Sequence, residues 1–115
     1  MTDYITNFLE GGPVPIEAYL AVSTIMFFAG VYGFLSRKNM IMVLMSIELM
    51  LNAADLNFVI FNRYLYPGAL EGFFFALFAI AIAAAETAVA LAIIINIYRN
   101  VKKIYIDENI TELKN

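Results

Sequence analysis

Residues 40–61 have the sequence MIMVLMSIELMLNAADLNFVIF, a long run in which apolar side chains predominate. A run of this length and composition predicts a helix that crosses a membrane. Glu48 lies near its middle and Asp55 lies two turns further on. A carboxylate near the centre of a bilayer costs about 2.5–3.5 kcal/mol on insertion scales, so its presence here requires a functional or packing reason.

Two further apolar runs flank this one, at residues 16–35 and 73–98, and the second of them carries Glu86 at its middle. Of the 115 residues, 63% are hydrophobic, and the mean hydropathy is +0.79, well above that of soluble domains. The predicted fold class is therefore an all-α integral membrane protein with three transmembrane helices, at about residues 16–35, 40–61 and 73–98.

Positive charges set the predicted orientation of these spans. Basic residues gather in the turn after the first span and directly after the third, namely Arg37, Lys38, Arg99, Lys102 and Lys103. The opposite side carries only Arg63. Because loops rich in Lys and Arg stay in the cytoplasm, we expect the N-terminus outside and the C-terminus cytoplasmic, in a multi-pass protein of the inner (cytoplasmic) membrane. Residues 1–15 then form a surface segment, residues 16–98 the three-helix membrane domain, and residues 99–115 a cytoplasmic tail that is either a short surface helix or loose.

The composition excludes several classes of site. The chain has no cysteine and no histidine, so it cannot ligate an iron–sulfur cluster, a thiolate zinc ion or a haem through these residues, and it has no cysteine nucleophile. It also lacks a glycine-rich phosphate loop, since Gly11-Gly12 is followed by Pro13. We therefore expect no catalytic residue, no metal ligand and no cofactor in this chain.

Polar residues of the middle span form one stripe. On a helical wheel Asn52, Asp55 and Asn62 all lie within about 40° of Glu48, whereas Asn57 lies on the opposite side. A polar stripe in lipid has to face protein or water. The middle span is therefore expected to pack against another helix along this line.

The third span surrounds its acid with small residues. Ala79, Ala83 and Ala90 lie within about 60° of Glu86, so that the segment AAAET at residues 83–87 is expected to form a close interface around this side chain. Counted from the cytoplasmic ends of their helices, Glu48, Glu86 and Asp55 lie about 12, 18 and 22 Å deep. Two carboxylates about 8 Å apart repel by about 2 kcal/mol at an effective dielectric near 20, so that one holds a proton while the other is charged. Such a ladder can relay protons; the alternative is that each acid only anchors a neighbouring helix.

These features resemble the subunit K family of proton-pumping NADH:quinone oxidoreductase, respiratory complex I. The resemblance covers about residues 19–99 and rests on the three-span plan, the RKN turn, SIELMLNAADLNFV with Glu48 and AAAETAVALAI with Glu86. It implies that Glu48 and Glu86 correspond to two glutamates of a hydrophilic axis that couples quinone reduction to proton movement. Asn52 matches a polar position of the family, and relatives commonly have an amide or a small residue where this chain has Asp55.

The same resemblance implies a non-redox subunit of an enzyme whose other subunits carry the NADH site, FMN and iron–sulfur clusters and whose substrate is a quinone. The implied partners are the quinone-proximal and antiporter-like subunits of the membrane arm and the lipid bilayer, with no nucleic acid. The predicted proton-relay residues are thus Glu48 and Glu86, with Asp55 and Asn52 as further candidates. Two alternatives stay open: the homologous small subunit of a multisubunit cation/proton antiporter or membrane-bound hydrogenase, and a free-standing small transporter or assembly factor.

Overall fold

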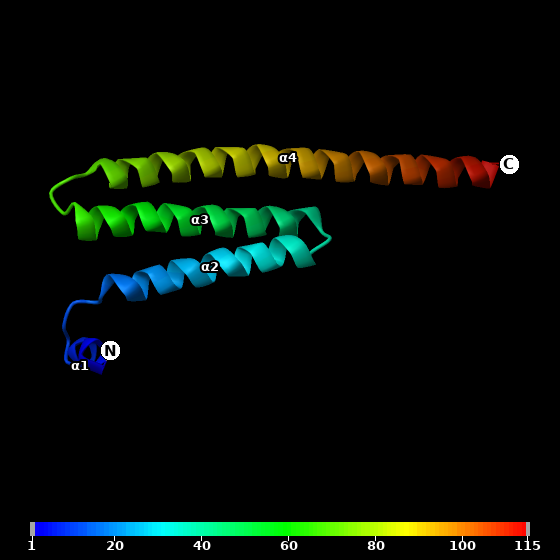
Figure 1. Cartoon of the computed structure of the whole chain (residues 1–115). Helices are drawn as coiled ribbons and strands as arrows, with labels where there is room; N and C mark the ends of the chain where they lie inside the picture. Colours follow the sequence, from blue (N-terminus) through cyan, green and yellow to red (C-terminus); the bar gives the residue numbers. More distant parts are fainter. Residues whose placement is uncertain (1, 115) are drawn as a thin grey trace.

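The computed structural model describes residues 2–114, which form helices joined by short turns, with no strand among them (Figure 1). Three of the helices are long and apolar enough to cross a membrane, which confirms the predicted three-span class. Helix α2 begins and ends within one residue of the predicted first span, whereas α3 and α4 continue beyond theirs. The helices are α1 (Thr2–Leu9), α2 (Ile16–Ser36), α3 (Met40–Leu65) and α4 (Glu71–Lys114).

The basic turn between α2 and α3 is only three residues long because both helix ends are capped locally. The backbone N–H of Arg37 donates to the carbonyl oxygen of Gly33 at 3.1 Å, which ends α2. The side chain of Asn39 accepts a hydrogen bond from the backbone N–H of Ile41 at 2.9 Å, which starts α3. Arg37 and Lys38 in this turn are exposed.

The three long helices lie in a row, with α3 in the middle (Figure 1). Within residues 2–114, α2 and α4 both contact α3 and make no contact with each other, and α1 contacts no other helix. The α2-facing side of α3 includes the buried residues Ser46 and Ala53, and its α4-facing side includes the buried Asp55 and Asn62. The molecule is thus an open single layer of helices rather than a closed bundle.

Close packing of α2 on α3 rests on small residues. The hydroxyl of Ser23 donates to the backbone oxygen of Ala53 at 2.9 Å, and Ser23 is only 2% exposed. Gly30 is buried two turns further along the same face of α2. A Cβ atom there would lie 2.5 Å from Met50 Cγ and 2.9 Å from the backbone oxygen of Ser46. Hydrogen there lets the two helix backbones approach closely.

Helix α4 departs most from its predicted span. It runs without a break from Glu71 to Lys114, although the hydrophobic run ends at Tyr98. At 1.5 Å per residue it is about 66 Å long, which accounts for most of the 79 Å length of the molecule. Residues 99–114 contain neither Pro nor Gly, so nothing ends the helix where the apolar run stops.

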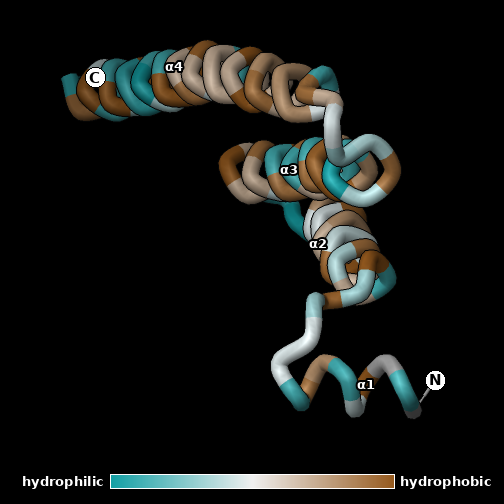
Figure 2. Tube along the Cα trace, turned by 90° about the vertical axis from the view of Figure 1, so that its left-hand side faces the viewer, coloured by the Kyte–Doolittle hydropathy of each residue, from teal (hydrophilic) through white to brown (hydrophobic). Residues whose placement is uncertain are grey.

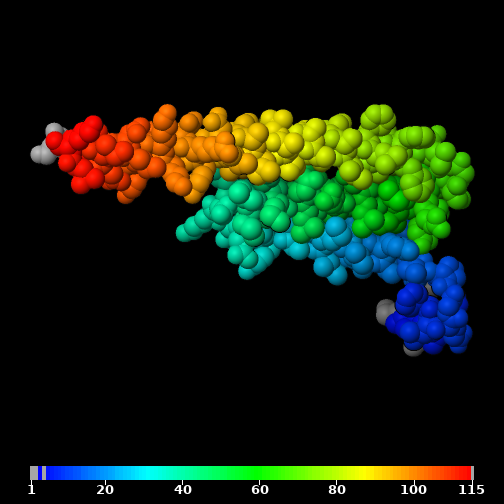
Figure 3. All heavy atoms as spheres, turned by 180° about the vertical axis from the view of Figure 1, so that it is seen from behind, coloured from blue at the N-terminus to red at the C-terminus, as the bar shows by residue number. Residues whose placement is uncertain are grey.

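The tail that was expected to be either a short helix or loose is therefore the last third of α4. It projects beyond the start of α3 (Figure 3), and hydrophilic residues gather toward this end of the helix (Figure 2). The N-terminal segment also contains a helix, α1, which is separated from α2 by the turn around Gly11-Gly12-Pro13.

We predict that Gly30→Ala destabilises the α2–α3 contact by about 1–3 kcal/mol, the usual cost of overpacking a tight site. The added methyl group would meet a backbone oxygen, which cannot move aside as a flexible side chain can. Gly68→Ala is the matched control, because a Cβ there has no atom within 4 Å. The midpoint of thermal unfolding, measured on the purified protein in detergent, should fall only for Gly30→Ala; equal midpoints for the two variants would contradict the packing.

Candidate functional site

The carboxylate of Glu48 joins α3 to α4. The hydroxyl of Thr87 donates a hydrogen bond to Glu48 Oε2 at 2.7 Å, and both side chains are half-buried. Among the described residues, it is the one hydrogen bond that joins a side chain of α3 to a side chain of α4. A carboxylate that accepts a hydrogen bond from a hydroxyl in this way is held in place, and its second oxygen stays free for another partner.

Glu48 opens on one side into a shallow groove of ≈ 380 Å³ along the α3–α4 seam. Asn52, one turn further along α3, lines the same groove and is itself exposed. The remainder of the lining is apolar apart from the Thr87 hydroxyl and is made by Ile41, Leu44, Met45, Leu49 and Leu91. Glu48 and Asn52 can therefore both be reached from outside the chain.

Asp55 lies deeper in the same interface. Its side chain is 7% exposed and faces α4, on the side of α3 that also carries Glu48. Its Oδ2 atom has no hydrogen-bond partner within residues 2–114. The helix opposite offers alanines there, Ala76 and Ala83, both buried. Burying a polar atom without a hydrogen-bond partner costs free energy. Glu48 accepts a hydrogen bond from Thr87, whereas no donor among the described residues reaches Asp55 Oδ2.

Asn62, the outermost residue of the predicted stripe, closes the turn between α3 and α4. Its Nδ2 donates to the backbone oxygen of Ala69 at 2.8 Å, and its Oδ1 accepts from the backbone N–H of Gly72 at 2.9 Å. A Cβ atom on Gly72 would lie 2.5 Å from the Cβ of Asn62, so only glycine permits this approach. Both functional groups of Asn62 are therefore engaged in structure, which separates it from the three acids and from Asn52.

Glu86 is not part of the α3–α4 interface. It is exposed on α4, although the neighbouring Ala83 is buried against α3 and Ala79 and Ala90 are half-buried. The alanines do make a close helix contact, but they make it with α3 of this chain. Thr87, and not Glu86, faces α3 in that contact. Glu86 and Glu48 are consequently not brought together by this chain alone.

Thr87 belongs to the site although the sequence did not single it out, whereas Asn57 lies away from the site, as the wheel predicted. Thr87 is the partner of Glu48, and the only signal for it is its place in AAAET, where it follows Glu86. Asn57 lies on the opposite side of α3 from the stripe, and its Oδ1 atom is buried without a hydrogen-bond partner among the described residues. Within residues 2–114 no group of three or more acidic side chains is placed to hold a metal ion.

Comparison with known proteins identifies related chains. Residues 18–114 match the model of the family described as NADH-ubiquinone/plastoquinone oxidoreductase chain 4L. Among curated proteins, the chain is 50% identical over 93 residues to NADH-quinone oxidoreductase subunit K of Geobacillus kaustophilus, a match that covers 81% of this chain and 92% of that protein. It is 51% identical over 96 residues to the protein of the same name from Bacillus anthracis, covering 83% of this chain and 91% of the relative. The Brevibacillus brevis protein of that name is 49% identical over 96 residues, with coverages of 83% and 92%.

Proposed function

Because the chain belongs to the NADH-ubiquinone/plastoquinone oxidoreductase chain 4L family, we propose that it is a membrane-arm subunit of a proton-translocating NADH:quinone oxidoreductase. Its part in that enzyme is to hold intramembrane carboxylates in the hydrophilic axis that couples quinone reduction to proton movement. It carries no electrons itself, since the redox groups belong to other subunits. The observation that carries this proposal is the position of Glu48, hydrogen-bonded across the α3–α4 seam and open on its other side.

The chemistry of Glu48 suits transfer of a proton to a neighbour. Its Oε2 is held by Thr87, while the groove leaves the carboxylate accessible from outside the chain. A carboxylate in a medium of low dielectric binds a proton when no cation is near, and releases it when one approaches. No Lys or Arg lies in residues 16–36, 40–62 or 71–98, so the cation that would control Glu48 has to come from another subunit.

The open layer of helices supports a place among larger neighbours. Only 6% of the apolar window of α4 is buried inside the chain, and Glu86 and Asn52 are exposed within the spans. A polar group left against lipid costs several kcal/mol. Neighbouring subunits, quinone-proximal on one side and antiporter-like on the other, would cover these groups and could bring Glu86 into the axis.

The basic residues support a cytoplasmic position for the α2–α3 turn in the inner membrane. Helices α3 and α4 are antiparallel neighbours, so the start of α3 lies beside residues 94–101 of α4 (Figure 1). Arg37 and Lys38 therefore lie at the same end of the layer as Arg99, Lys102 and Lys103, which is the end that the positive-inside rule assigns to the cytoplasm.

The alternative of a cation/proton antiporter or hydrogenase subunit has less support. The curated relatives at about half identity all bear the name of an NADH-quinone oxidoreductase subunit. A free-standing transporter is disfavoured on physical grounds, because a row of three helices with exposed polar residues encloses no path across the membrane.

We expect Glu48→Gln to lower proton pumping and coupled NADH:quinone turnover on the order of tenfold or more while the complex still assembles. Glutamine keeps the shape and accepts the Thr87 hydrogen bond but cannot ionise. Glu86→Gln should have a milder effect. Glu71→Gln is the matched control, because Glu71 is an exposed acid at the start of α4, outside the predicted spans. Normal pumping by Glu48→Gln at normal complex levels would show that Glu48 only anchors α4.

Asp55→Asn distinguishes a third relay acid from a buried hydrogen-bonding group. Asparagine preserves the size of the side chain and removes only the titratable proton. If Asp55 stays protonated and acts as an amide would, pumping and turnover in membrane vesicles should stay near normal. A loss comparable to that of Glu48→Gln, with the complex intact on a native gel, would instead make Asp55 a member of the relay. We expect near-normal activity, because the family resemblance implies that an amide or a small residue can occupy this position.

The orientation is tested with single cysteines in this cysteine-free chain. Gly68→Cys lies in the exposed α3–α4 turn and Asn109→Cys in the exposed last part of α4. A membrane-impermeant maleimide should label Gly68→Cys in intact cells and Asn109→Cys only after lysis, because the five basic residues hold their end of the layer in the cytoplasm. Labelling of Asn109→Cys in intact cells would reverse the assignment.

A further inference from the structure

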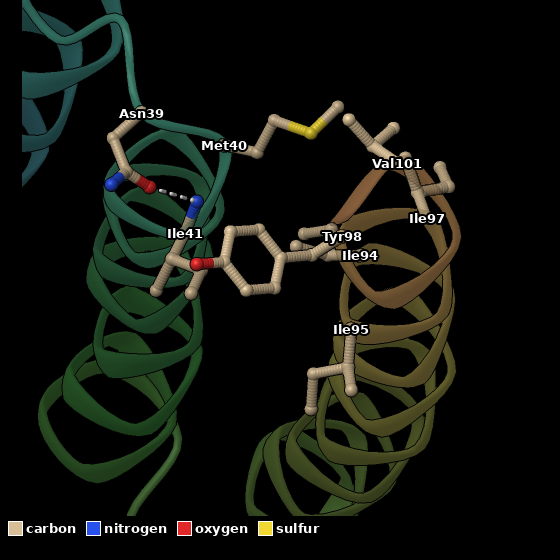
Figure 4. A pocket seen from close by; sticks show the side chains of 8 residues that line it. All are labelled: Asn39, Met40, Ile41, Ile94, Ile95, Ile97, Tyr98 and Val101. Atoms are coloured by element: carbon tan, nitrogen blue, oxygen red, sulfur yellow. Dashed lines mark hydrogen bonds between the residues drawn. The ribbon is translucent and has the colours of Figure 1, made fainter. Parts of the chain in front are cut away.

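A second groove opens between α3 and α4, at the end of the layer that carries the basic residues. It has a volume of ≈ 420 Å³, and its lining is almost entirely apolar. Figure 4 shows the Tyr98 ring reaching across from α4 toward Ile41 at the start of α3, with Met40, Ile95 and Val101 around the space. Every residue that lines the groove is exposed except Ile94, which is half-buried, so the groove is open to the outside of the chain.

The residues of α4 that face α3 change in size along the helix. Near the α3–α4 turn they are glycine and alanine, at Gly72, Ala76 and Ala83, and the helices pack closely. Beyond Ala90 the same face carries the larger residues Ile94, Tyr98 and Val101. Helix α4 also continues past the start of α3, so its face is uncovered at this end.

The surroundings of the groove are positively charged. A second, smaller groove of ≈ 280 Å³ shares Met40 and Ile94 with it and is lined by Lys38. Lys102 follows Val101 on α4, and Arg99 and Lys103 lie within one turn of it. Within residues 2–114 none of these cations forms an ion pair. The N-terminal end of α3, capped by Asn39, adds a partial positive charge at the same level.

We propose that this groove binds an anionic phospholipid, with one acyl chain between α3 and α4 and the phosphate between Lys38 and Lys102. The apolar lining matches an acyl chain, the unpaired cations match the phosphate, and the two lie at the depth where a chain meets its headgroup. The volume falls in the range of small-ligand sites, about 300–1,000 Å³.

The test uses the chain with the subunits that copurify with it, reconstituted in phosphatidylcholine nanodiscs. Two probes with the same diazirine-bearing acyl chain are compared, a phosphatidylglycerol and a phosphatidylcholine, and labelled peptides are identified by mass spectrometry. Residues 94–101 should be labelled about fivefold or more by the anionic probe relative to the zwitterionic one, the ratio that one nearby cation supplies.

Two variants separate the apolar and the charged parts of the site. Ile95→Trp fills the groove and should abolish the preferential labelling, and Lys38→Gln with Lys102→Gln should lower it fivefold or more. Ile82→Trp is the matched control. It fills a groove of ≈ 490 Å³ at the opposite end of α4 that is bordered by the acidic Glu71, and it should leave the labelling of residues 94–101 unchanged.

Equal labelling by the two probes, or labelling that survives Ile95→Trp, would reduce the site to ordinary lipid contact and overturn the proposal. So would the absence of lipid label at residues 94–101, because the groove would then hold no lipid. None of these outcomes depends on NADH oxidation or proton pumping. The proposal can therefore fail while the proposed function stands, and the reverse.

Discussion

A helix in a bilayer has to satisfy its polar groups against other helices, and α3 does so on two opposite faces. On one face the hydroxyl of Ser23 reaches the backbone of α3 at Ala53, where small residues bring α2 close. On the other face, Asn62 hydrogen-bonds the backbone of the turn and of the start of α4, and Glu48 accepts a hydrogen bond from the Thr87 hydroxyl. These two sets of contacts lie on opposite sides of α3. The three long helices therefore form a row, in which α2 and α4 do not meet.

The row leaves several polar groups of α3 and α4 without a hydrogen-bond partner among the described residues. Asp55 and Asn57 each bury an oxygen without a partner in the described chain, on opposite sides of α3. Asn52 and Glu86 are exposed at membrane depth. The polar groups thus divide into those that hold this chain together and those that are incomplete in it. Glu48 belongs to both sets, because one oxygen is held within the chain while the groove gives access to the rest of the carboxylate.

The sequence was sufficient for the number of spans, because run length carries that information directly. It also placed Glu48, Asp55 and Asn62 on one side of α3, and the structure puts all three toward α4. It could not show that Asn62 serves the turn, since that depends on the chain returning at Ala69 and Gly72. Nor could it choose between Glu86 and Thr87 as the residue nearest Glu48, because a wheel gives no absolute rotation of one helix against another. The length of α4 was missed for a different reason: hydropathy falls at Tyr98, whereas helix formation does not depend on hydropathy.

The unbroken course of α4 has a mechanical consequence. With no Pro or Gly after Gly72, the helix has no hinge between its intramembrane part and the part beyond the start of α3. The last sixteen residues form a rigid lever about 24 Å long, so a tilt of about 10° in the membrane would move its tip by about 4 Å. A small rotation of α4 against α3 at Thr87 would thereby be amplified at a distant end, where basic side chains are followed by acidic ones.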